Sequence, residues 1–455
     1  MSVFGLTRFR GASLGARAVR SSLWSTGAFA ASQLLRLGSN LILTRLLFPE
    51  AFGLMALVAV IIQGLTNFSD TGVMQAVMSH KRGEDPRFLN TAFTIQAIRG
   101  VLLWVFACLL AWPLSLFYNA PQLIQILPAA ALSLIVMGVN PMRVATAHRH
   151  LLLGRVSLLD ILSQTLGVLI AIALAWWMQS VWALVISGVL AAIINVAFNW
   201  AFLPGHPDRL QWDRAAAREL TSFGKWIFLS TIAGFFVSQG DRILIGRFLS
   251  LGAFGVYNIG YFLASFPNML GRMVAGKVLI PIYREAPPGE SRANFLKLRR
   301  MRMVVTATLL AIIAVLGMAG LWLVELLYDE RYRDAGPVIV LLAVMWIPQI
   351  IALTYDQAAL AVGDSRNFFV LALFRAVTLL GCVYLGLEMA GLLGAIIGQG
   401  MAGLLSYPVV VWLSRKSGAW DPLHDALFAM LGLAVTAVLF TAHRADIVAL
   451  AAGAL

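Results

Sequence analysis

The sequence predicts an all-α polytopic membrane protein with two six-helix bundles, followed by one or two hydrophobic helices at its C-terminal end. Of the 455 residues, 60% are hydrophobic and only 12% are charged, whereas a soluble domain carries about 25% charged residues. The apolar residues form runs, most of them near the length of about 20 residues that crosses a bilayer. A segment of the first half also recurs in the second half. These observations exclude a soluble globular protein.

The apolar runs end at charged residues or at Pro and Gly clusters. Six of them lie at 23–46, 52–79, 91–116, 123–146, 157–178 and 181–203, and six more at 222–248, 253–280, 303–327, 336–360, 368–387 and 391–413. Weaker runs follow at 426–442 and 445–455, and the last is too short to cross a bilayer alone. We therefore expect a cytoplasmic basic tail (1–22), an N-terminal lobe (23–204), a cytoplasmic linker (205–221), a C-terminal lobe (222–413) and C-terminal hydrophobic helices (414–455).

The basic residues predict the orientation. The chain has 34 Lys and Arg against 21 Asp and Glu, a net charge of +13. With a cytoplasmic N-terminus, 21 basic residues fall in the tail and cytoplasmic loops, and only Arg331, Arg333 and Arg444 fall on the opposite side. This is the asymmetry that the positive-inside rule describes. The Arg-rich tail lacks the apolar core of a cleaved signal peptide, and an organelle transit peptide is its weaker alternative interpretation.

The internal repeat predicts the symmetry. Leu43–Gly53, LTRLLFPEAFG, recurs 202 residues later as Ile245–Gly255, IGRFLSLGAFG. Each unit would contain six crossings, so both units enter and leave on the same side of the membrane. They should be related by a pseudo-two-fold axis along the membrane normal, with a substrate site at their interface. The repeat therefore favours a two-lobed transporter.

Ten basic residues and five acidic residues fall within the apolar runs: Arg36, Arg45, Arg99, Arg143, Lys225, Arg242, Arg247, Arg272, Lys277 and Arg375, and Asp70, Asp160, Asp241, Glu325 and Asp356. A charge at the centre of a span costs about 2.5–3.5 kcal/mol on insertion scales, and such residues usually face a cavity. Six members lie near span ends, where long side chains reach the interface, and we expect them to be structural. They are Arg45, Arg99, Arg143, Lys225, Arg247 and Glu325.

The deeper charges lie on polar stripes at helical spacing. The four stripes are Gln33, Arg36 and Asn40; Gln63, Thr66, Asn67 and Asp70; Thr231, Gly234, Ser238, Asp241 and Arg242; and Asn258, Tyr261, Ser265, Asn268 and Arg272. The repeat offset of 202 residues aligns Thr66 with Asn268 and Asp70 with Arg272. The same helix face is therefore polar in both lobes, which suits a shared cavity. The alternative is polar packing between adjacent helices.

The candidate substrate-binding residues are Arg36, Asn40, Asp70, Asp241, Arg242, Asn268, Arg272, Lys277 and Arg375. Asp160 and Asp356 are candidates for gating or ion coupling, although simple ion pairing would also explain them. The stretch from Gly271 to Lys277 begins like a phosphate-binding loop, but Val278 stands where that motif requires Ser or Thr. We expect no catalytic residue, no cofactor, no metal site and no nucleic-acid partner.

Two segments resemble a known family. Leu41 to Met78, LILTRLLFPEAFGLMALVAVIIQGLTNFSDTGVMQAVM, and Ser238 to Pro267, SQGDRILIGRFLSLGAFGVYNIGYFLASFP, are similar to the first and second lobes of bacterial polysaccharide flippases. These are the O-antigen and exopolysaccharide exporters of the multidrug/oligosaccharidyl-lipid/polysaccharide superfamily. The resemblance extends to about residue 413. It implies two bundles that alternate between inward-open and outward-open states in the bacterial inner membrane.

The implied cargo is an undecaprenyl-diphosphate-linked oligosaccharide, moved to the periplasmic leaflet for polysaccharide synthesis. Its implied partners are membrane lipids, the polysaccharide polymerase and the chain-length machinery. The basic surplus within the spans suits the anionic diphosphate, with Arg36, Arg272 and Arg375 as the leading contacts. A drug or organic-cation antiporter of the same superfamily would instead need unpaired cavity carboxylates, such as Asp70. A membrane polysaccharide polymerase or ligase is less favoured, because the long periplasmic loop of such enzymes is absent from the sequence.

Overall fold

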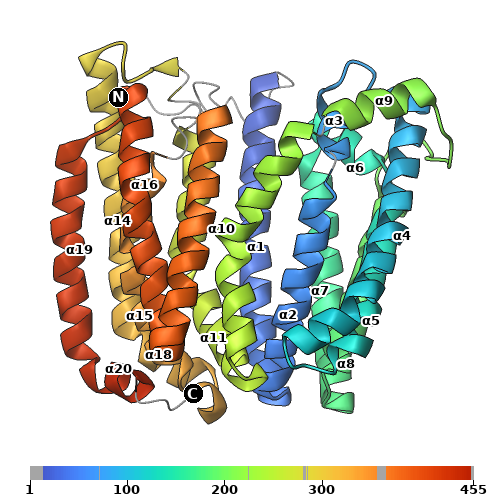
Figure 1. The fold of residues 1–455 in the computed structure, drawn as a ribbon. Coiled ribbons are helices and arrows are strands. Elements are labelled where there is room, and N and C mark those ends of the chain that lie inside the picture. The colour runs from blue at the N-terminus through green and yellow to red at the C-terminus, as the bar shows by residue number, and fades with distance from the viewer. Residues whose placement is uncertain are drawn as a thin grey trace. The chain divides into compact units, whose positions relative to one another are not determined.

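Every described element of the computed structural model is a helix (Figure 1). The structure describes residues 14–70, 72–223, 225–279, 283, 285–355 and 365–451, with only the backbone at 14–23, 25, 221–223, 225–230, 277–278 and 365–366. No β-strand occurs in these ranges, and the all-α prediction is confirmed.

The chain forms two compact units. The N-terminal unit comprises Met1–Leu47 and Ile61–Thr231, and the C-terminal unit comprises Phe48–Val60 and Ile232–Leu455. Two helices run from one unit into the other: α2 (Pro49–Phe68) and α10 (Lys225–Phe248).

The N-terminal unit contains α1 (Leu14–Leu46), α3 (Val73–Ser79), α4 (Pro86–Phe117), α5 (Leu123–Gly138), α6 (Arg143–Arg149), α7 (Leu153–Met178), α8 (Trp182–Phe202) and α9 (Arg214–Phe223). Here α4 packs along α5, while α7 packs along both α8 and α1 (Figure 1). The Arg99 guanidinium donates to Ser69 Oγ at 2.9 Å and to the Thr66 carbonyl at 2.7 Å. The Arg143 guanidinium donates to the carbonyls of Trp200 (2.8 Å) and His206 (3.1 Å). Both arginines thus have hydrogen-bond partners within the N-terminal unit, and their structural role stays a prediction.

The C-terminal unit contains α11 (Leu251–Ala264), α12 (Phe266–Val274), a π-helical turn (Ala275–Leu279), α14 (Arg292–Leu327), a 3₁₀ turn η3 (Glu330–Tyr332), α15 (Ala335–Met345), α16 (Ile347–Leu353), α18 (Ser365–Lys416), α19 (Pro422–Ala442) and α20 (Arg444–Ala451). α14 packs along α15 and α19, and α11 packs along α15. Non-helical backbone at Ala390 and Gly391 breaks α18, where the sequence separates two apolar runs. α20 has eight residues, about 12 Å of helix, so it does not cross a bilayer.

Seven helices of the described chain are long and apolar enough to cross a membrane, or nine when each of two bent helix pairs counts as one span. The sequence predicts twelve main runs. Three predicted runs, at α1, α10 and the α11–α12 segment, are not among these candidate spans, and they carry three of the four polar stripes. The broken α18 contains two predicted runs but counts as one helix. The protein is a multi-pass membrane protein.

Corresponding spans of the two repeats are broken. In the N-terminal repeat, residues 69–72 separate α2 from α3, and α5 meets α6 at a bend of 61°. In the C-terminal repeat, Ser265 separates α11 from α12, and Trp346 lies at the 44° bend between α15 and α16. Pro267 and Pro348 each occupy the second position of the helix after the break. A proline there lacks the N–H that would continue the preceding helix, and its ring clashes with the carbonyl four residues earlier.

The two copies of the repeated Ala-Phe-Gly motif meet inside the C-terminal unit. A Cβ built on Gly53 would lie 1.9 Å from the Leu251 carbonyl oxygen, and one on Gly255 would lie 2.1 Å from the Pro49 carbonyl oxygen. Both contacts join a glycine to the residue four positions before its repeat equivalent. The start of α2 therefore crosses the start of α11 with local two-fold symmetry, and only glycine permits this backbone approach.

A buried polar network attaches α19 to α14. Arg302 is fully buried, hydrogen-bonds to the Ala419 carbonyl and the Tyr283 hydroxyl, and lies 4.2 Å from the Tyr355 ring centre. About one turn of α14 further on, Thr306 Oγ1 contacts His424 Nε2 of α19 at 3.0 Å. Arg302 Nη1 and Nη2 and Thr306 Oγ1 each have a partner, which offsets much of the cost of their burial, whereas Arg302 Nε has none.

Candidate functional site

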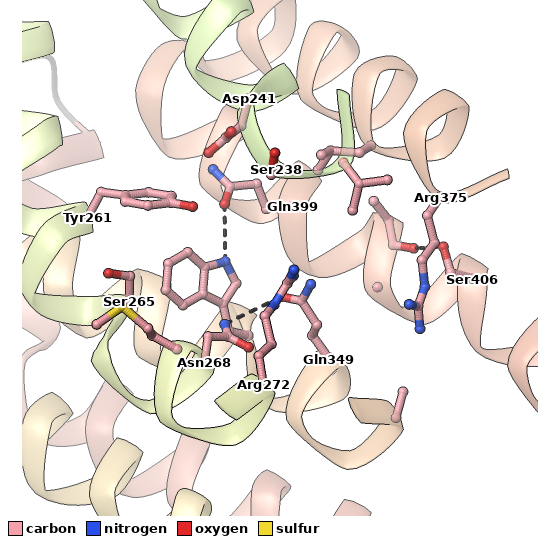
Figure 2. Close-up of a pocket in the computed structure, with 17 residues that line it drawn as sticks. Ser238, Asp241, Tyr261, Ser265, Asn268, Arg272, Gln349, Arg375, Gln399 and Ser406 are labelled. Carbon is pink, nitrogen blue, oxygen red and sulfur yellow. Dashed lines mark hydrogen bonds between the residues drawn. The ribbon is translucent and has the colours of Figure 1, made fainter. Parts of the chain in front are cut away.

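A polar pocket of about 280 Å³ lies within the C-terminal unit (Figure 2). Its walls come from α10, α11, α12, α18 and the α15–α16 segment. The polar side chains that line it are Ser238, Asp241, Tyr261, Ser265, Asn268, Arg272, Trp346, Gln349, Arg375, Gln399 and Ser406. Four of the nine predicted substrate-binding residues, Asp241, Asn268, Arg272 and Arg375, are thus brought together.

The two helix breaks of this unit position much of the pocket lining. Ser265 is the break residue between α11 and α12, and Asn268 lies in the first turn of α12. Trp346 is the break residue between α15 and α16, and Gln349 follows it by three positions. Interrupted spans in corresponding positions of two repeats are a recognised mark of transporter binding sites. In the C-terminal unit, the breaks at Ser265 and Trp346 lead into one cavity.

A directed chain of hydrogen bonds holds the acidic end of the pocket. The Trp346 indole N–H donates to Gln399 Oε1 at 3.1 Å, and Gln399 Nε2 donates to the Tyr257 hydroxyl at 3.0 Å. That hydroxyl donates to Asp241 Oδ2 at 3.0 Å. Asp241 is buried, so its carboxylate has a protein partner where water is scarce. These hydrogen bonds also fix the orientation of the Trp346 side chain.

The basic side chains of the pocket differ in their partners. Arg272 lies one helical turn after Asn268 on α12 and is drawn with Asn268 and Gln349 in the lower part of Figure 2, whereas Asp241 is drawn at the top. Among the described residues, the Arg272 guanidinium makes neither a hydrogen bond nor an ion pair. Arg242 does not line the pocket. Its guanidinium lies 4.0 Å from the Tyr261 ring centre and donates to Gln239 Oε1 at 3.0 Å. Arg272 is therefore the pocket cation best placed for an external anion.

Arg36, Asn40, Asp70 and Asp160 do not line this pocket. Arg36 is exposed and Asn40 half-buried on α1 of the N-terminal unit. Asp70 accepts a hydrogen bond from the Gly72 amide at 2.9 Å, just after α2 ends, and Asp160 is exposed on α7, where it accepts one from Asn195 Nδ2 at 3.0 Å. Lys277 lies in the π-helical turn with its side chain outside the described part of the chain, and Asp356 lies entirely outside it.

Sequence reasoning missed Trp346, Gln349, Gln399 and Ser406 as site residues. It searched the spans for charge, and these four side chains are neutral. An amide in the interior of an apolar run carries a similar though weaker signal, because its polar atoms also need partners in lipid. Counting Gln and Asn as well as charged residues in the runs at 336–360 and 391–413 would have found Gln349 and Gln399. No group of three or more His, Cys, Asp or Glu side chains with metal-binding geometry occurs in the described ranges.

Comparison with solved structures identifies the fold. The fold matches that of the lipid II flippase MurJ in an inward closed conformation, with a TM-score of 0.65 over 93% of this chain and 99% of that chain at 12% identity. It also matches an inward-facing multidrug-resistance transporter of the MATE family and MOP superfamily, with a TM-score of 0.63 over 85% and 95% of the two chains at 14% identity. The chain has the two-bundle fold of these membrane transporters.

The chain belongs to the family of polysaccharide biosynthesis proteins, whose sequence profile matches residues 42–337. The family assigned from the two quoted segments is therefore confirmed. One relative is the succinoglycan biosynthesis transport protein ExoT of Rhizobium meliloti (strain 1021), 24% identical over 83% of this chain and 75% of that protein. Another is the lipopolysaccharide biosynthesis protein WzxC of Escherichia coli (strain K12), 22% identical over 88% and 82%.

Proposed function

We propose that the protein is a flippase that moves undecaprenyl-diphosphate-linked oligosaccharide repeat units from the cytoplasmic to the periplasmic leaflet of the bacterial inner membrane. The observation that carries the proposal is the charge of the pocket. Among the described lining residues, Arg272 and Arg375 are basic, and the one carboxylate, Asp241, is held by Tyr257. Membership of the polysaccharide biosynthesis family supports the cargo class, as do relatives named for succinoglycan transport and lipopolysaccharide biosynthesis.

The physical argument is charge compensation. Charged side chains within membrane spans usually face a substrate pathway. Arg272 is exposed where it lines the pocket, so a bound diphosphate would be able to pair with it. A guanidinium is also suited to the task, because its planar N–H groups bind phosphate oxygens in pairs. Two negative charges that move outward gain about 4–5 kcal/mol per 100 mV from an inside-negative membrane potential. The proposed export therefore does not require ATP.

A second cavity supports a lipid cargo. It has a volume of about 680 Å³ and uses the α15–α16 segment, α18 and α19. Its lining is mostly apolar and includes Ile347, Ile351, Met401 and Leu404. The α15–α16 segment and α18 thus line a polar pocket with one set of residues and an apolar cavity with another, as an amphipathic cargo with a prenyl chain requires.

We further propose alternating access of the two sequence-defined lobes, 23–204 and 222–413, with the N-terminus in the cytoplasm. Arg36 and Asn40 of α1 would then contribute to the binding site in one of the states. Asp160 and Asp356 remain our candidates for gating or coupling. A polysaccharide polymerase and the chain-length machinery are the proposed protein partners.

A reconstituted flipping assay tests this function. Proteoliposomes would contain undecaprenyl diphosphate linked to a fluorescent oligosaccharide, and an impermeant quencher would report the label that reaches the outer leaflet. We expect the purified protein to accelerate the exchange. Arg272→Ala should slow it about tenfold or more, because a hydrogen bond to a charged group contributes about 1.5–3 kcal/mol. Arg36→Ala should also slow it.

Arg247→Ala is the matched control, since Arg247 is exposed in the last turn of α10 and does not line the pocket. It should exchange the label at the wild-type rate. Equal rates for wild type and Arg272→Ala would contradict a role of the pocket in transport. In cells, deletion of the gene should make lipid-linked repeat units accumulate in the inner leaflet. Normal polysaccharide with raised drug sensitivity would favour the antiporter instead.

A further inference from the structure

We propose that Asn268, Gln349 and Trp346 form a subsite for the sugar ring adjacent to the diphosphate, next to Arg272. This inference rests on the flippase function proposed above, and it names the part of the cargo that the C-terminal unit recognises. It assigns the neutral side chains of the pocket a role in substrate discrimination, while the arginines attract the anion.

The first observation is an unsatisfied acceptor. Asn268 Oδ1 is buried and has no hydrogen-bond partner in the described structure. The amide nitrogen of the same side chain contacts Gln349 Oε1 at 3.5 Å, at the outer limit of a hydrogen bond. A buried acceptor without a donor is unfavourable, so a ligand that supplies an O–H or N–H group gains affinity here. Sugar hydroxyl and N-acetyl groups supply such donors, and a diphosphate does not.

The second observation is a rigid aromatic side chain beside these amides. Trp346 lines the pocket with its indole N–H bound to Gln399 Oε1. Tyr261 packs edge-on against it, with ring centres 5.1 Å apart and planes at 81°. Both contacts reduce the conformational freedom of the indole, so little entropy remains to be lost on binding. Pyranose rings present C–H groups that pack against aromatic side chains, while their hydroxyl groups hydrogen-bond to amides.

The third observation is size. A volume of about 280 Å³ lies just below the range of roughly 300–1,000 Å³ for small-molecule sites. It suits one sugar ring beside a phosphate, and it is too small for a whole oligosaccharide. We therefore expect the subsite to contact the first sugar and to make no contact with the outer sugars, since Arg272 would hold the diphosphate at the same end of the pocket.

A pair of probes tests the subsite. Binding of undecaprenyl diphosphate would be compared with binding of undecaprenyl diphosphate that carries a single hexose or N-acetylhexosamine, on purified full-length protein in nanodiscs. We expect the wild type to bind at least one sugar-bearing probe about tenfold more tightly. Asn268→Leu and Gln349→Met should each remove most of this tenfold difference, the loss expected for one hydrogen bond. Their affinity for undecaprenyl diphosphate should not change, whereas Arg272→Ala should weaken the binding of every probe.

Asn258→Leu is the matched control, because Asn258 lies on the neighbouring α11, bonds its own helix at the Phe254 carbonyl and does not line the pocket. It should retain the sugar preference. If the wild type binds all probes equally and Arg272→Ala weakens them all, the subsite is wrong and the flippase function stands. If no probe binds, both proposals fail. If Asn268→Leu and Gln349→Met lower the thermal stability but keep the sugar preference, the amides only join helices, and the subsite is again overturned.

Discussion

At the scale of single residues, Asp421 shows how this fold stabilises a buried charge. Its side chain is fully buried at the start of α19 and accepts two hydrogen bonds from the Arg299 guanidinium, at 2.5 and 2.8 Å. Burial alone would raise the pKa of the Asp421 carboxyl. The hydrogen bonds from Arg299 and from the His424 amide outweigh burial, and the pKa lies below its ordinary value. The carboxylate is therefore charged at neutral pH and holds α19 against α14.

We predict that Asp421→Asn lowers the free energy of unfolding by about 2–3 kcal/mol at pH 7. This is below the 3–5 kcal/mol typical of a fully buried pair, because a quarter of the Arg299 side chain is exposed. A lowered pKa in the folded state stabilises the protein above the unfolded pKa of about 3.9, and this contribution is lost as the pH falls through the folded pKa.

Thermal unfolding of the wild type and Asp421→Asn between pH 7 and pH 3 would measure this effect. The two curves should converge below about pH 4. Glu290→Gln, which alters an exposed carboxylate of a loop, should follow the wild type throughout. A constant difference between wild type and Asp421→Asn at every pH would show that charge pairing is not the cause.

The site residues were only partly predictable at this scale. A charge within an apolar run is conspicuous, so Asp241, Arg272 and Arg375 were found from their cost in a membrane. The same criterion does not distinguish Arg242, which stacks on Tyr261 and lies outside the pocket lining. A search for charged residues cannot find Trp346, because aromatic residues are common in membrane spans. Its hydrogen bond to Gln399 and its position at a helix break are known only from the structure.

At the scale of elements, the glycine crossing explains why one repeat motif was detectable by sequence. Most repeat positions need only an apolar residue, so they diverge without cost. Gly53 and Gly255 cannot, because each would place a Cβ within about 2 Å of the partner helix's backbone. The surviving Ala-Phe-Gly copies are thus a packing constraint that the two repeats share.

We predict that Gly255→Ala destabilises the protein by about 1–3 kcal/mol or more, since backbone must move to admit the methyl group. Gly381→Ala is the matched control, because nothing lies within 4 Å of a Cβ at that position of α18. It should be neutral or stabilising by up to about 1 kcal/mol through helix propensity. Thermal unfolding of both purified variants would compare them. Equal melting temperatures would argue that α2 and α11 do not cross this closely.

The breaks at Ser265 and Trp346 were not predicted as breaks. The run at 253–280 and the run at 336–360 are each continuous in hydropathy, so they read as single spans. Pro267 and Pro348 are a local signal, yet proline is common within transmembrane helices because neighbouring groups satisfy the freed carbonyls. Where such a helix bends depends on what packs against it.

At the scale of the whole molecule, the asymmetry of the basic loops makes a topological prediction. Serine in place of Cys108 and Cys382 gives a cysteine-free protein, in which single cysteines are placed at the exposed positions Glu84 or Glu330. We expect an impermeant maleimide to label the Glu330 position in intact cells and the Glu84 position only after the membrane is opened. The physical reason is the retention of basic loops, such as that of Lys81 and Arg82, in the cytoplasm.

Both cysteine variants should first be shown to export polysaccharide at wild-type levels, so that labelling reports the native topology. The reverse labelling pattern would contradict a cytoplasmic N-terminus. Labelling of both positions in intact cells would contradict a membrane span between the two loops.

The sequence by itself determined the membrane class, the all-helical fold, the family and most of the charged side chains of the pocket. These follow from composition, apolar run length and the cost of charge in lipid, which act on each residue wherever it lies in the fold. Only the tertiary structure decided that four neutral side chains, Trp346, Gln349, Gln399 and Ser406, join those charges around one cavity. The reason is that helix breaks and close glycine contacts set how neighbouring spans face one another, and no single run of the sequence contains both partners.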